Sequence, residues 1–411
     1  MAPANENYDN FFERYDFYDY RPPSSENINQ PGGEFPITVY NEDIITLPCE
    51  SRLVFTGQIS VNTIATDGTA TAVTNIDTSK IDFDLNGILH RFEFIEYKVG
   101  EHKVDDIRKP GISTTMKGLA SFRPNMAQSL SGWNIYQGAK SLINSSGYFT
   151  IIKPLSELMG CFEDYRKCLV RIPQTLIFHI STSSDNNCFY SKEGTKYQVS
   201  FKFTDIIWRM RHIKLRIDKE AKLRKEVLTS TNYTMYFRHW LYQSTTLPVG
   251  TTEYTWDVPV SHSKVKYAII AFQKDVVGKL DKQMGRFDLL NVENVQLEIN
   301  NYWLYPKDRL NIKYTENKCG NIFEMFKAFP KSYYNRPEED PVCDYITFLT
   351  DFPMIIIDCS HQPEVIKDSL INTKIHFNFR DDGFPDKGMV HLLMIMDCKA
   401  VYNPLNNQVI T

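Results

Sequence analysis

Short apolar runs, separated by turn residues along almost the whole chain, limit the fold more than any other feature of this sequence. The runs are rich in Ile, Val, Phe, Tyr and Thr, and Gly, Pro, Asn and Asp lie between them. This composition and spacing favour the strands of antiparallel sandwiches. Helical patterns are brief, so the sequence predicts a mostly β fold. The runs are FPITVY, SRLVFTGQIS, HRFEFIEYKV, SGYFTIIKPL, QTLIFHIS, KYQVSFKF, RHIKLRI, KYAIIAF, VQLEI, FPMIIIDC, KIHFNF and MVHLLMIM.

The chain has two halves that repeat one plan. Its 411 residues are too many for one ordinary core and favour two domains of about 200 residues. The tripeptide Phe-Asp-Leu at residues 83–85 recurs at residues 287–289, and each copy precedes a strand, a charged turn and a short helix. This repeated order indicates duplicated domains that meet near residues 204–210. We predict an N-terminal arm at residues 1–34, a first domain at 35–205 and a second domain at 206–411.

The sequence lacks the motifs of common enzymes. It contains no GxSxG nucleophile elbow, no HExxH zinc motif, and no GxxxxGK[ST] or GxGxxG phosphate loop. The most enzyme-like segment is Asp358-Cys359-Ser360-His361, because a thiol beside an imidazole can be activated as a nucleophile. Adjacent strand residues point to opposite faces, however, so we interpret this segment as the end of a buried strand. We predict a protein that is not an enzyme, with no catalytic residue, cofactor or metal site.

Charge and cysteine usage give a compartment but no partner. The formal net charge is −4, which is too close to neutral to indicate nucleic acid or membrane binding by the whole surface. No run of eighteen apolar residues is present, so no membrane span is expected. The eight cysteines show no CxxC motif and no disulfide-like spacing. We interpret them as buried thiols in a reducing compartment.

A basic strip lies near the predicted domain boundary. Between Lys202 and Lys225 there are nine Lys or Arg residues and three acidic residues. Such a strip can neutralise phosphates. The alternative is an exposed surface that is paired with acidic groups from elsewhere in the chain or from a neighbouring subunit. The residues of the strip are Arg209, Arg211, Lys214, Arg216, Lys222, Arg224 and Lys225.

The segment YDNFFERYDFYDYRPP, residues 8–23, is unusually aromatic for a chain end. Solvated tails are normally poor in aromatic residues, so we predict an assembly arm that docks on a neighbouring subunit. Its acidic residues recur every three or four positions, which favours a short helix that ends before Pro22-Pro23. A flexible tail is the alternative. The aromatic residues of the arm are Tyr8, Phe11, Phe12, Tyr15, Phe17, Tyr18 and Tyr20.

Several blocks resemble, in the same order, capsid-like proteins of virus-like elements in insect and cnidarian genomes. That family is similar to the double jelly-roll major capsid proteins of the adenovirus, Polinton and small bacteriophage lineage. The resemblance runs from about residue 35 to the C-terminus. The blocks are YKVGEHKVDDIRKPGISTTMKGLASF, SGYFTIIKPLSELMGCFEDYRKCLV, DIIWRMRHIKL, EMFKAFPKSYYN, FPMIIIDCSHQPEVIKDSLINTKIHFNF and MIMDCKAVYNPLNNQVI.

The resemblance implies two tandem eight-stranded antiparallel jelly rolls with short helices in their loops. It also implies a structural major capsid protein of a DNA virus or virus-like element, whose trimers form capsomers of hexagonal outline in an icosahedral shell. The expected partners are further copies of the chain, a minor capsid or penton protein and, through weak non-specific contacts, packaged DNA. The expected location is the virion, assembled inside the host cell. The acidic and aromatic arm has no counterpart in this family pattern.

Two other functions compete with the capsid interpretation. A jelly-roll protein outside any shell could bind a carbohydrate or receptor through exposed aromatic residues, for which Trp133, Trp240 and Trp303 are candidates. A β-rich hydrolase could use dispersed carboxylates. The duplicated halves and the missing catalytic motifs favour the capsid interpretation.

Overall fold

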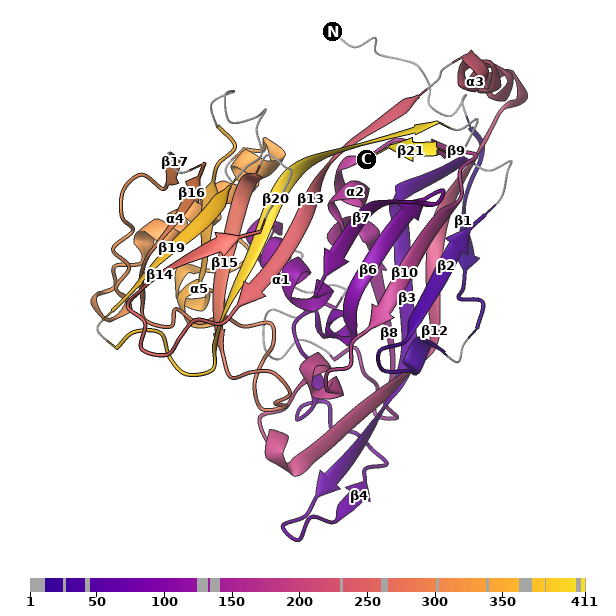
Figure 1. Ribbon diagram of the computed structural model, residues 1–411. Helices are drawn as coiled ribbons and strands as arrows, with labels where there is room; N and C mark the ends of the chain where they lie inside the picture. The colour runs from indigo at the N-terminus through magenta and orange to yellow at the C-terminus, as the bar shows by residue number, and fades with distance from the viewer. Residues whose placement is uncertain are drawn as a thin grey trace.

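Strands dominate the computed structural model of the chain, and they form two sandwiches side by side (Figure 1). The described residues are 12–24, 27–40, 45–123, 132–133, 141–229, 232–259, 265–300, 303–337, 340–361, 372–380, 382–403 and 408–410.

The first sandwich has eight main strands in two facing sheets. In one sheet β12 lies between β1 and β3, and β3 pairs on its other side with β8. The other sheet has the order β2-β10-β6-β7. The main strands are β1 (Phe12–Tyr20), β2 (Glu34–Val39), β3 (Ile45–Ile64), β6 (Phe92–Val99), β7 (His102–Arg108), β8 (Tyr148–Pro154), β10 (Gln174–Ile180) and β12 (Tyr197–Leu215). Shorter strands are β4 (Ala70–Ala72), β5 (Asp82–Phe83), β9 (Leu169–Val170) and β11 (Phe189–Tyr190).

The second sandwich repeats this arrangement. One sheet has the order β13-β20-β15-β18, and the other has the order β14-β19-β16-β17. The main strands are β13 (Tyr233–Thr245), β14 (Glu253–Val258), β15 (Val265–Lys274), β16 (Val292–Ile299), β17 (Trp303–Tyr305), β18 (Met354–Asp358), β19 (Thr373–Phe379) and β20 (Gly388–Asn403), and β21 (Gln408–Ile410) pairs with β20.

Both sandwiches connect their main strands in the same permutation. Numbered in chain order within each sandwich, the sheets read first-eighth-third-sixth and second-seventh-fourth-fifth in both halves. This order of eight strands in two facing sheets is that of a jelly roll, so the chain folds as a double jelly roll and the predicted fold class is confirmed. The Phe-Asp-Leu repeats at 83–85 and 287–289 precede the fourth strands, β6 and β16.

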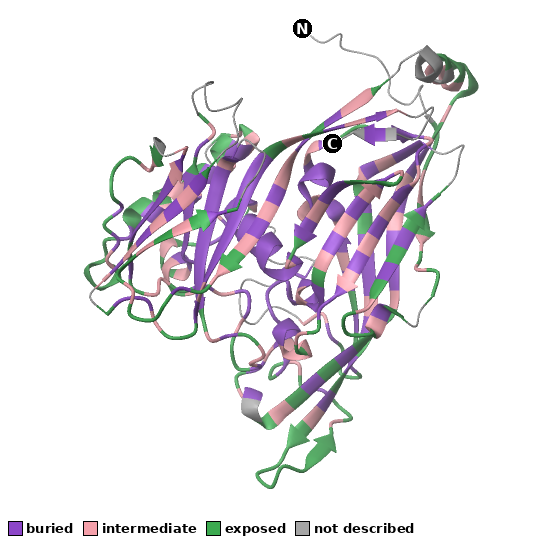
Figure 2. Cartoon of the chain, viewed as in Figure 1, coloured by how far each residue is buried: buried purple, intermediate pink, exposed green. Residues whose placement is uncertain are grey.

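Helices occupy the connections between strands. Helices α1 and α4 both follow the fifth strand of their roll, and α1 is buried along its whole length between the two rolls (Figure 2). The helices are α1 (Pro110–Ser121), α2 (Gly160–Asp164), α3 (Ile217–Thr229), α4 (Gly320–Tyr334) and α5 (Tyr345–Asp351). Short 3-10 helices cover residues 27–29, 87–91, 155–157, 185–188, 194–196 and 314–316.

The structure corrects one expectation about the chain near β1 and β12 and places a second prediction within β12. The expected helix in the aromatic arm is wrong, because residues 12–20 form β1 and pair antiparallel with β12 from Phe12↔Leu215 to Tyr20↔Trp208. Pairing with β12 satisfies the backbone hydrogen bonds of β1, whereas an isolated helix of this length would be only marginally stable. The predicted domain boundary at residues 205 and 206 lies inside β12, which pairs with β3 and β1 as far as Ile213 and Leu215.

Candidate assembly surface and the junction between the rolls

The acidic residues of β1 face the basic strip of β12 within the same chain. Arg209 makes two hydrogen bonds to the carboxylate of Asp19, at 2.7 and 2.9 Å. Five residues further along β12, Lys214 Nζ lies 3.1 Å from Glu13 Oε1. The guanidinium group of Arg209 lowers the pKa of Asp19 through its hydrogen bonds. These contacts match the alternative in which acidic groups from elsewhere in the chain pair with the strip.

Arg211 is the centre of this charged surface. Its Nε lies 3.1 Å from Glu50 Oε2, and its guanidinium carbon lies 3.9 and 3.7 Å from the ring centroids of Tyr15 and Phe17. The hydroxyl group of Tyr15 donates to Glu50 at 2.6 Å. Burial and this hydrogen bond raise the pKa of Tyr15 to about 12. Arg211 therefore ties β1 to β3 across β12, by a salt bridge and by cation–π contacts.

On the opposite face of β1, two tyrosines cover His212. Tyr18 stacks on the imidazole ring at 4.3 Å between centroids, and the Tyr20 hydroxyl lies 3.0 Å from His212 Nε2. Burial lowers the pKa of His212 to about 4, so the ring is neutral near pH 7. Tyr15 and Tyr18 remain 39% and 44% exposed, so β1 presents aromatic surface to solvent while it is paired.

The rest of the predicted site continues into α3, which projects from one end of the first roll (Figure 1). Arg216 lies 3.9 Å from Asp218 in an exposed pair. Lys222 and Lys225 are exposed on α3. Tyr8, Phe11 and the side chains of Phe12 and Arg224 lie outside the described residues.

A buried lysine joins the two rolls. Lys117, on α1, is 2% exposed; its ammonium group contacts the carboxylate of Glu163 on α2 and lies 2.7 Å from the hydroxyl of Tyr334 on α4. Tyr333 and Tyr334 both donate to Glu163 at 2.6 Å. Burial opposes the charged ammonium, but the charge and hydrogen bond of Glu163 outweigh it and raise the pKa of Lys117. Trp240, on β13, covers the ammonium group at 4.7 Å from the ring centroid.

A second ionic contact extends this junction along β13. Arg238 bonds Asp164 through Nε at 2.8 Å and donates from Nη1 to the carbonyl oxygen of Tyr333 at 2.7 Å. Next to it, His239 Nδ1 lies 2.7 Å from Asp105 Oδ1 on β7. The backbones also meet closely, since a Cβ atom on Gly160 would lie 1.5 Å from the carbonyl oxygen of Arg238. Helix α2 of the first roll can therefore approach β13 of the second only with glycine at this position.

The aspartate of the first Phe-Asp-Leu repeat makes a third contact between the rolls. Asp84 is 1% exposed, and its Oδ2 accepts the backbone N–H of Gly285 at 3.0 Å. Its Oδ1 accepts the N–H of Leu85 at 2.8 Å and lies 3.4 Å from Nε2 of Gln283. Burial raises the pKa of Asp84 to about 6.

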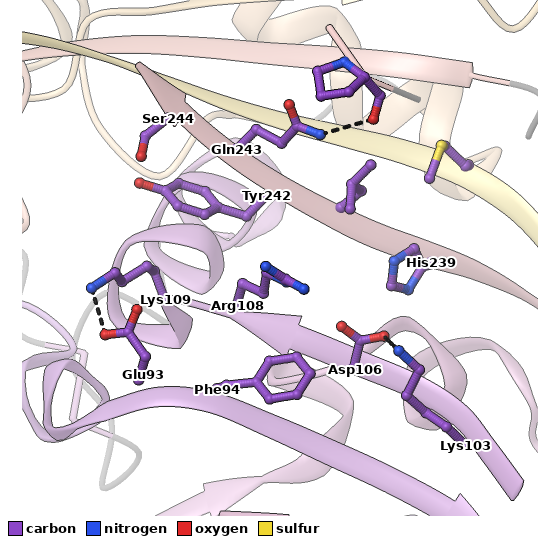
Figure 3. Close-up of a pocket in the computed structure, with 13 residues that line it drawn as sticks. Glu93, Phe94, Lys103, Asp106, Arg108, Lys109, His239, Tyr242, Gln243 and Ser244 are labelled. Carbon is purple, nitrogen blue, oxygen red and sulfur yellow. Dashed lines mark hydrogen bonds and ion pairs between the residues drawn. The ribbon is translucent and has the colours of Figure 1, made fainter. Parts of the chain in front are cut away.

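A cleft of about 990 Å³ opens beside the junction, between the edge strands β7 and β13 (Figure 3). Its charged groups are mostly paired with each other: Lys103 lies 3.0 Å from Asp106, and Lys109 bonds Glu93 at 2.5 Å. Arg108 lies over the ring of Phe94 at 5.5 Å.

Three of the residues considered for other functions, Trp133, Trp240 and Cys359, lie in the core. Trp133 and Trp240 are both 1% exposed, so they cannot form a carbohydrate-binding surface, and the side chain of Trp303 is outside the described set. Cys359 is also 1% exposed, and burial raises the pKa of its thiol. In the described ranges, no three His, Cys, Asp or Glu side chains converge as metal ligands, and no helix has the length and apolar character to cross a membrane.

Comparison with known families and structures agrees with this architecture. The family model described as "Double jelly roll-like domain" matches residues 82–399. The chain belongs to this family. A search of the curated proteins finds no match.

Solved structures with the same fold include viral major capsid proteins. The mavirus major capsid protein shares 9% identity at a TM-score of 0.58, over 100% of this chain and 91% of that chain. A chain of the Sputnik virophage shares 9% identity at 0.61, over 97% and 88%. The Faustovirus major capsid protein shares 8% at 0.54, over 98% and 92%. At these identities the likeness shows the shared fold.

The sequence carries one signal for the junction but does not identify it. Lys117 is the only charged residue between Pro110 and Ser121, in a segment that is otherwise small or apolar. A lone lysine in a buried helix needs a charged partner, because unpaired buried charges are costly. The sequence does not say that this partner is Glu163.

Proposed function

We propose that this protein is a structural major capsid subunit of a DNA virus or virus-like element. The observation that carries the proposal is the strand permutation that both rolls share. One subunit with two similar rolls gives a closed ring of pseudo-sixfold outline when three copies associate about a threefold axis. Such trimers would tile an icosahedral shell. The fold shared with viral major capsid proteins supports the proposal.

The rigidity of the subunit is the second support. A capsomer keeps its outline only when the angle between its two rolls is fixed. Lys117 and Glu163 of the first roll bond Tyr334 and Tyr333 of the second, and Arg238 of the second roll bonds Asp164 of the first. We therefore treat the rolls as two domains that assemble as one rigid unit, and place their division in the connection through α3, after β12 ends.

The partners follow from the exposed surfaces. The outer edge of β1 and its tyrosines form the surface that we assign to contacts with a neighbouring subunit or capsomer, in place of a free arm. Minor capsid or penton proteins would occupy positions where trimers do not meet. Lys222 and Lys225 on α3 would make weak, sequence-independent contacts with packaged DNA. The subunit would act without a cofactor and without enzymatic activity, in a virion assembled inside the host cell.

Light scattering of the purified full-length protein tests the proposal. We expect trimers, or larger closed particles, under conditions that preserve the fold. The Tyr18→Glu variant should keep its trimers but close fewer shells, whereas Tyr314→Glu, at an exposed position of the second roll, serves as the matched control. A stable monomer over the whole accessible concentration range contradicts the proposal.

The nucleic-acid contact has its own test. Charge reversal at Lys222 and Lys225 should leave assembly intact and lower the nucleic-acid content of purified particles, because each lost cation removes a phosphate contact. The matched control is the same reversal at Lys318, an exposed lysine of the second roll. Equal nucleic-acid content in all three proteins would remove α3 from the DNA-binding surface.

A further inference from the structure

The first roll contains a buried lysine that the assembly function does not use. Lys153, on β8, is fully buried, and its Nζ lies 2.7 Å from Oδ1 of Asn86. The same Nζ lies 3.5 Å from Oε2 of Glu157. An amine, a carboxamide and a carboxylate therefore meet at one point in the core of the roll.

The carboxamide of Asn86 is held in one orientation. Its Nδ2 donates to Oγ1 of Thr114 at 2.6 Å and lies 3.3 Å from Oγ1 of Thr115, both buried on α1. The backbone N–H of Asn86 donates to Gly132 at 3.0 Å. Because a C=O bond is about 1.2 Å long, the amide carbon lies at most about 3.9 Å from Nζ of Lys153. This is close to the separation of about 3 to 3.5 Å at which reacting atoms are positioned for attack.

The carboxylate of Glu157 is also oriented. It accepts the indole N–H of Trp133 at 3.0 Å, and the ring of Trp133 lies 5.1 Å from Nζ of Lys153. Burial lowers the pKa of Lys153 to about 8, although the charge of Glu157 opposes this shift. A part of the Lys153 population is therefore neutral, and nucleophilic, near neutral pH.

We propose that Lys153 and Asn86 form an intramolecular isopeptide bond, with Glu157 as the proton carrier. Glu157 takes one proton from the ammonium group of Lys153, and the free electron pair of Nζ attacks Cγ of Asn86. A C–N bond forms between Nζ and Cγ, and the bond between Cγ and Nδ2 breaks. The departing nitrogen receives one proton from Nζ and one from Glu157 and leaves as ammonium. The products are an amide and ammonium, and no oxidant or other reactant is needed.

Among the described residues, the other buried lysine, Lys117, provides an internal comparison. Lys117 also contacts a glutamate, but its remaining polar partner is the hydroxyl of Tyr334, which offers no carbonyl carbon. Lys117 therefore has only an ionic role, whereas Lys153 lies beside the carboxamide carbon of Asn86, with which its amine can react. The bond would close the chain from Asn86 to Lys153 and so tie the connection that precedes β6 to β8, which restricts the unfolded chain as a disulfide does.

Mass spectrometry of the denatured full-length protein tests the proposal. We expect an intact mass lower by one ammonia than the sequence mass. Trypsin should release residues 81–91 joined to residues 141–166, because cleavage at Lys80, Arg91, Lys140 and Arg166 frees these two peptides. The Glu157→Gln variant should retain the full mass while its circular dichroism spectrum stays that of a folded β protein. Lys117→Met, the matched control, should still show the loss of ammonia.

Wild-type protein that keeps its full mass after prolonged incubation above the pKa of Lys153 would overturn the proposal. So would a loss of ammonia that persists in Lys153→Met, since the loss would then come from another residue. Neither result depends on whether the protein forms a shell, so this test is separate from the test of the capsid function.

Discussion

Two charge clusters, built from the same residue types, occupy opposite environments in this protein. On the outer face of the first roll, Arg209 pairs with Asp19, and the two side chains are 38% and 30% exposed. At the junction between the rolls, Lys117 pairs with Glu163, and these side chains are 2% and 9% exposed. Exposed ion pairs contribute about 0 to 1 kcal/mol each, whereas removal of one partner from a buried pair costs about 3 to 5 kcal/mol.

This difference in burial allows the two rolls of one subunit to be held rigidly while the outer surface of β1 can still exchange its contacts. The buried pair cannot lose a partner without leaving a buried charge, and Tyr333 and Tyr334 of the second roll donate to Glu163, so the pair helps to fix the two rolls relative to each other. The pairs across β1 and β12 can be exchanged for water or for a neighbouring subunit at little cost. The outer cluster therefore suits contacts that form during assembly, and the inner cluster suits the subunit itself.

The largest expected effect comes from breaking the buried pair. Lys117→Met leaves the carboxylate of Glu163 without its cation, so the free energy of unfolding should fall by about 3 to 5 kcal/mol. Chemical denaturation measures this change. The double variant Lys117→Met/Glu163→Gln should recover part of the loss, because no buried charge remains. If the free energy of unfolding of Lys117→Met fell by less than about 1 kcal/mol, the buried pair would contribute no more than an exposed pair, which would contradict this distinction.

A smaller effect is expected from Asp84 and depends on pH. Its pKa is raised to about 6 in the folded protein and is about 4 in the unfolded chain, so the folded state binds the proton more tightly. Its contribution to stability is complete below pH 4 and is lost as the pH rises through 6, by about 3 kcal/mol in total. Denaturation at several pH values should show this slope in the wild type and a flatter one in Asp84→Asn. Identical slopes would show that Asp84 titrates normally.

His239 should add a shallower slope at higher pH. Burial lowers its pKa, but the hydrogen bond and charge of Asp105 outweigh burial and raise the pKa overall. The stability that it contributes is therefore present below about pH 6.5, the pKa of histidine in an unfolded chain, and is lost as the pH rises above that value. In His239→Gln this part of the pH dependence should disappear. Titration of the imidazole by nuclear magnetic resonance checks the direction, and a pKa below the ordinary value would contradict it.

The smallest effect is expected at the outer cluster. Asp19→Asn should lower the free energy of unfolding by less than about 1 kcal/mol, and the loss should shrink at high salt because exposed charges are screened. Asp16→Asn is the matched control, since Asp16 pairs with Arg14 on its own strand and links no second strand. A loss in Asp19→Asn comparable to that of Lys117→Met would remove the distinction between the clusters.

The sequence predicted the fold better than it predicted the contacts. Alternating runs identify strands, and a repeated order identifies duplication, because both are local patterns. The acidic residues of the arm recur every three or four positions, which favours a helix. Its partner strand β12 is almost two hundred residues away in sequence. Asp19 and Glu13 can pair with Arg209 and Lys214 from a strand, so the spacing of the acids does not require a helix. Local spacing could not choose between these two structures.

The junction and the Lys153 site lay beyond the sequence for a related reason. Lys117, Glu163 and Tyr334 come from three different helices of two rolls, and Asn86 and Lys153, 67 residues apart in sequence, meet only in the folded roll. A lone lysine in an apolar segment indicates that a partner exists. Only the fold identifies the partner, because each roll determines which distant segments come together.

Cryo-electron microscopy of the purified full-length protein tests the central claim most directly. The claim is that two rolls of one permutation, locked by a buried junction, make a capsid subunit. It predicts particles with a threefold axis and a six-lobed outline, two lobes from each subunit, alone or tiled into closed shells. Folded single subunits, with no threefold particle at any concentration or salt, would contradict it.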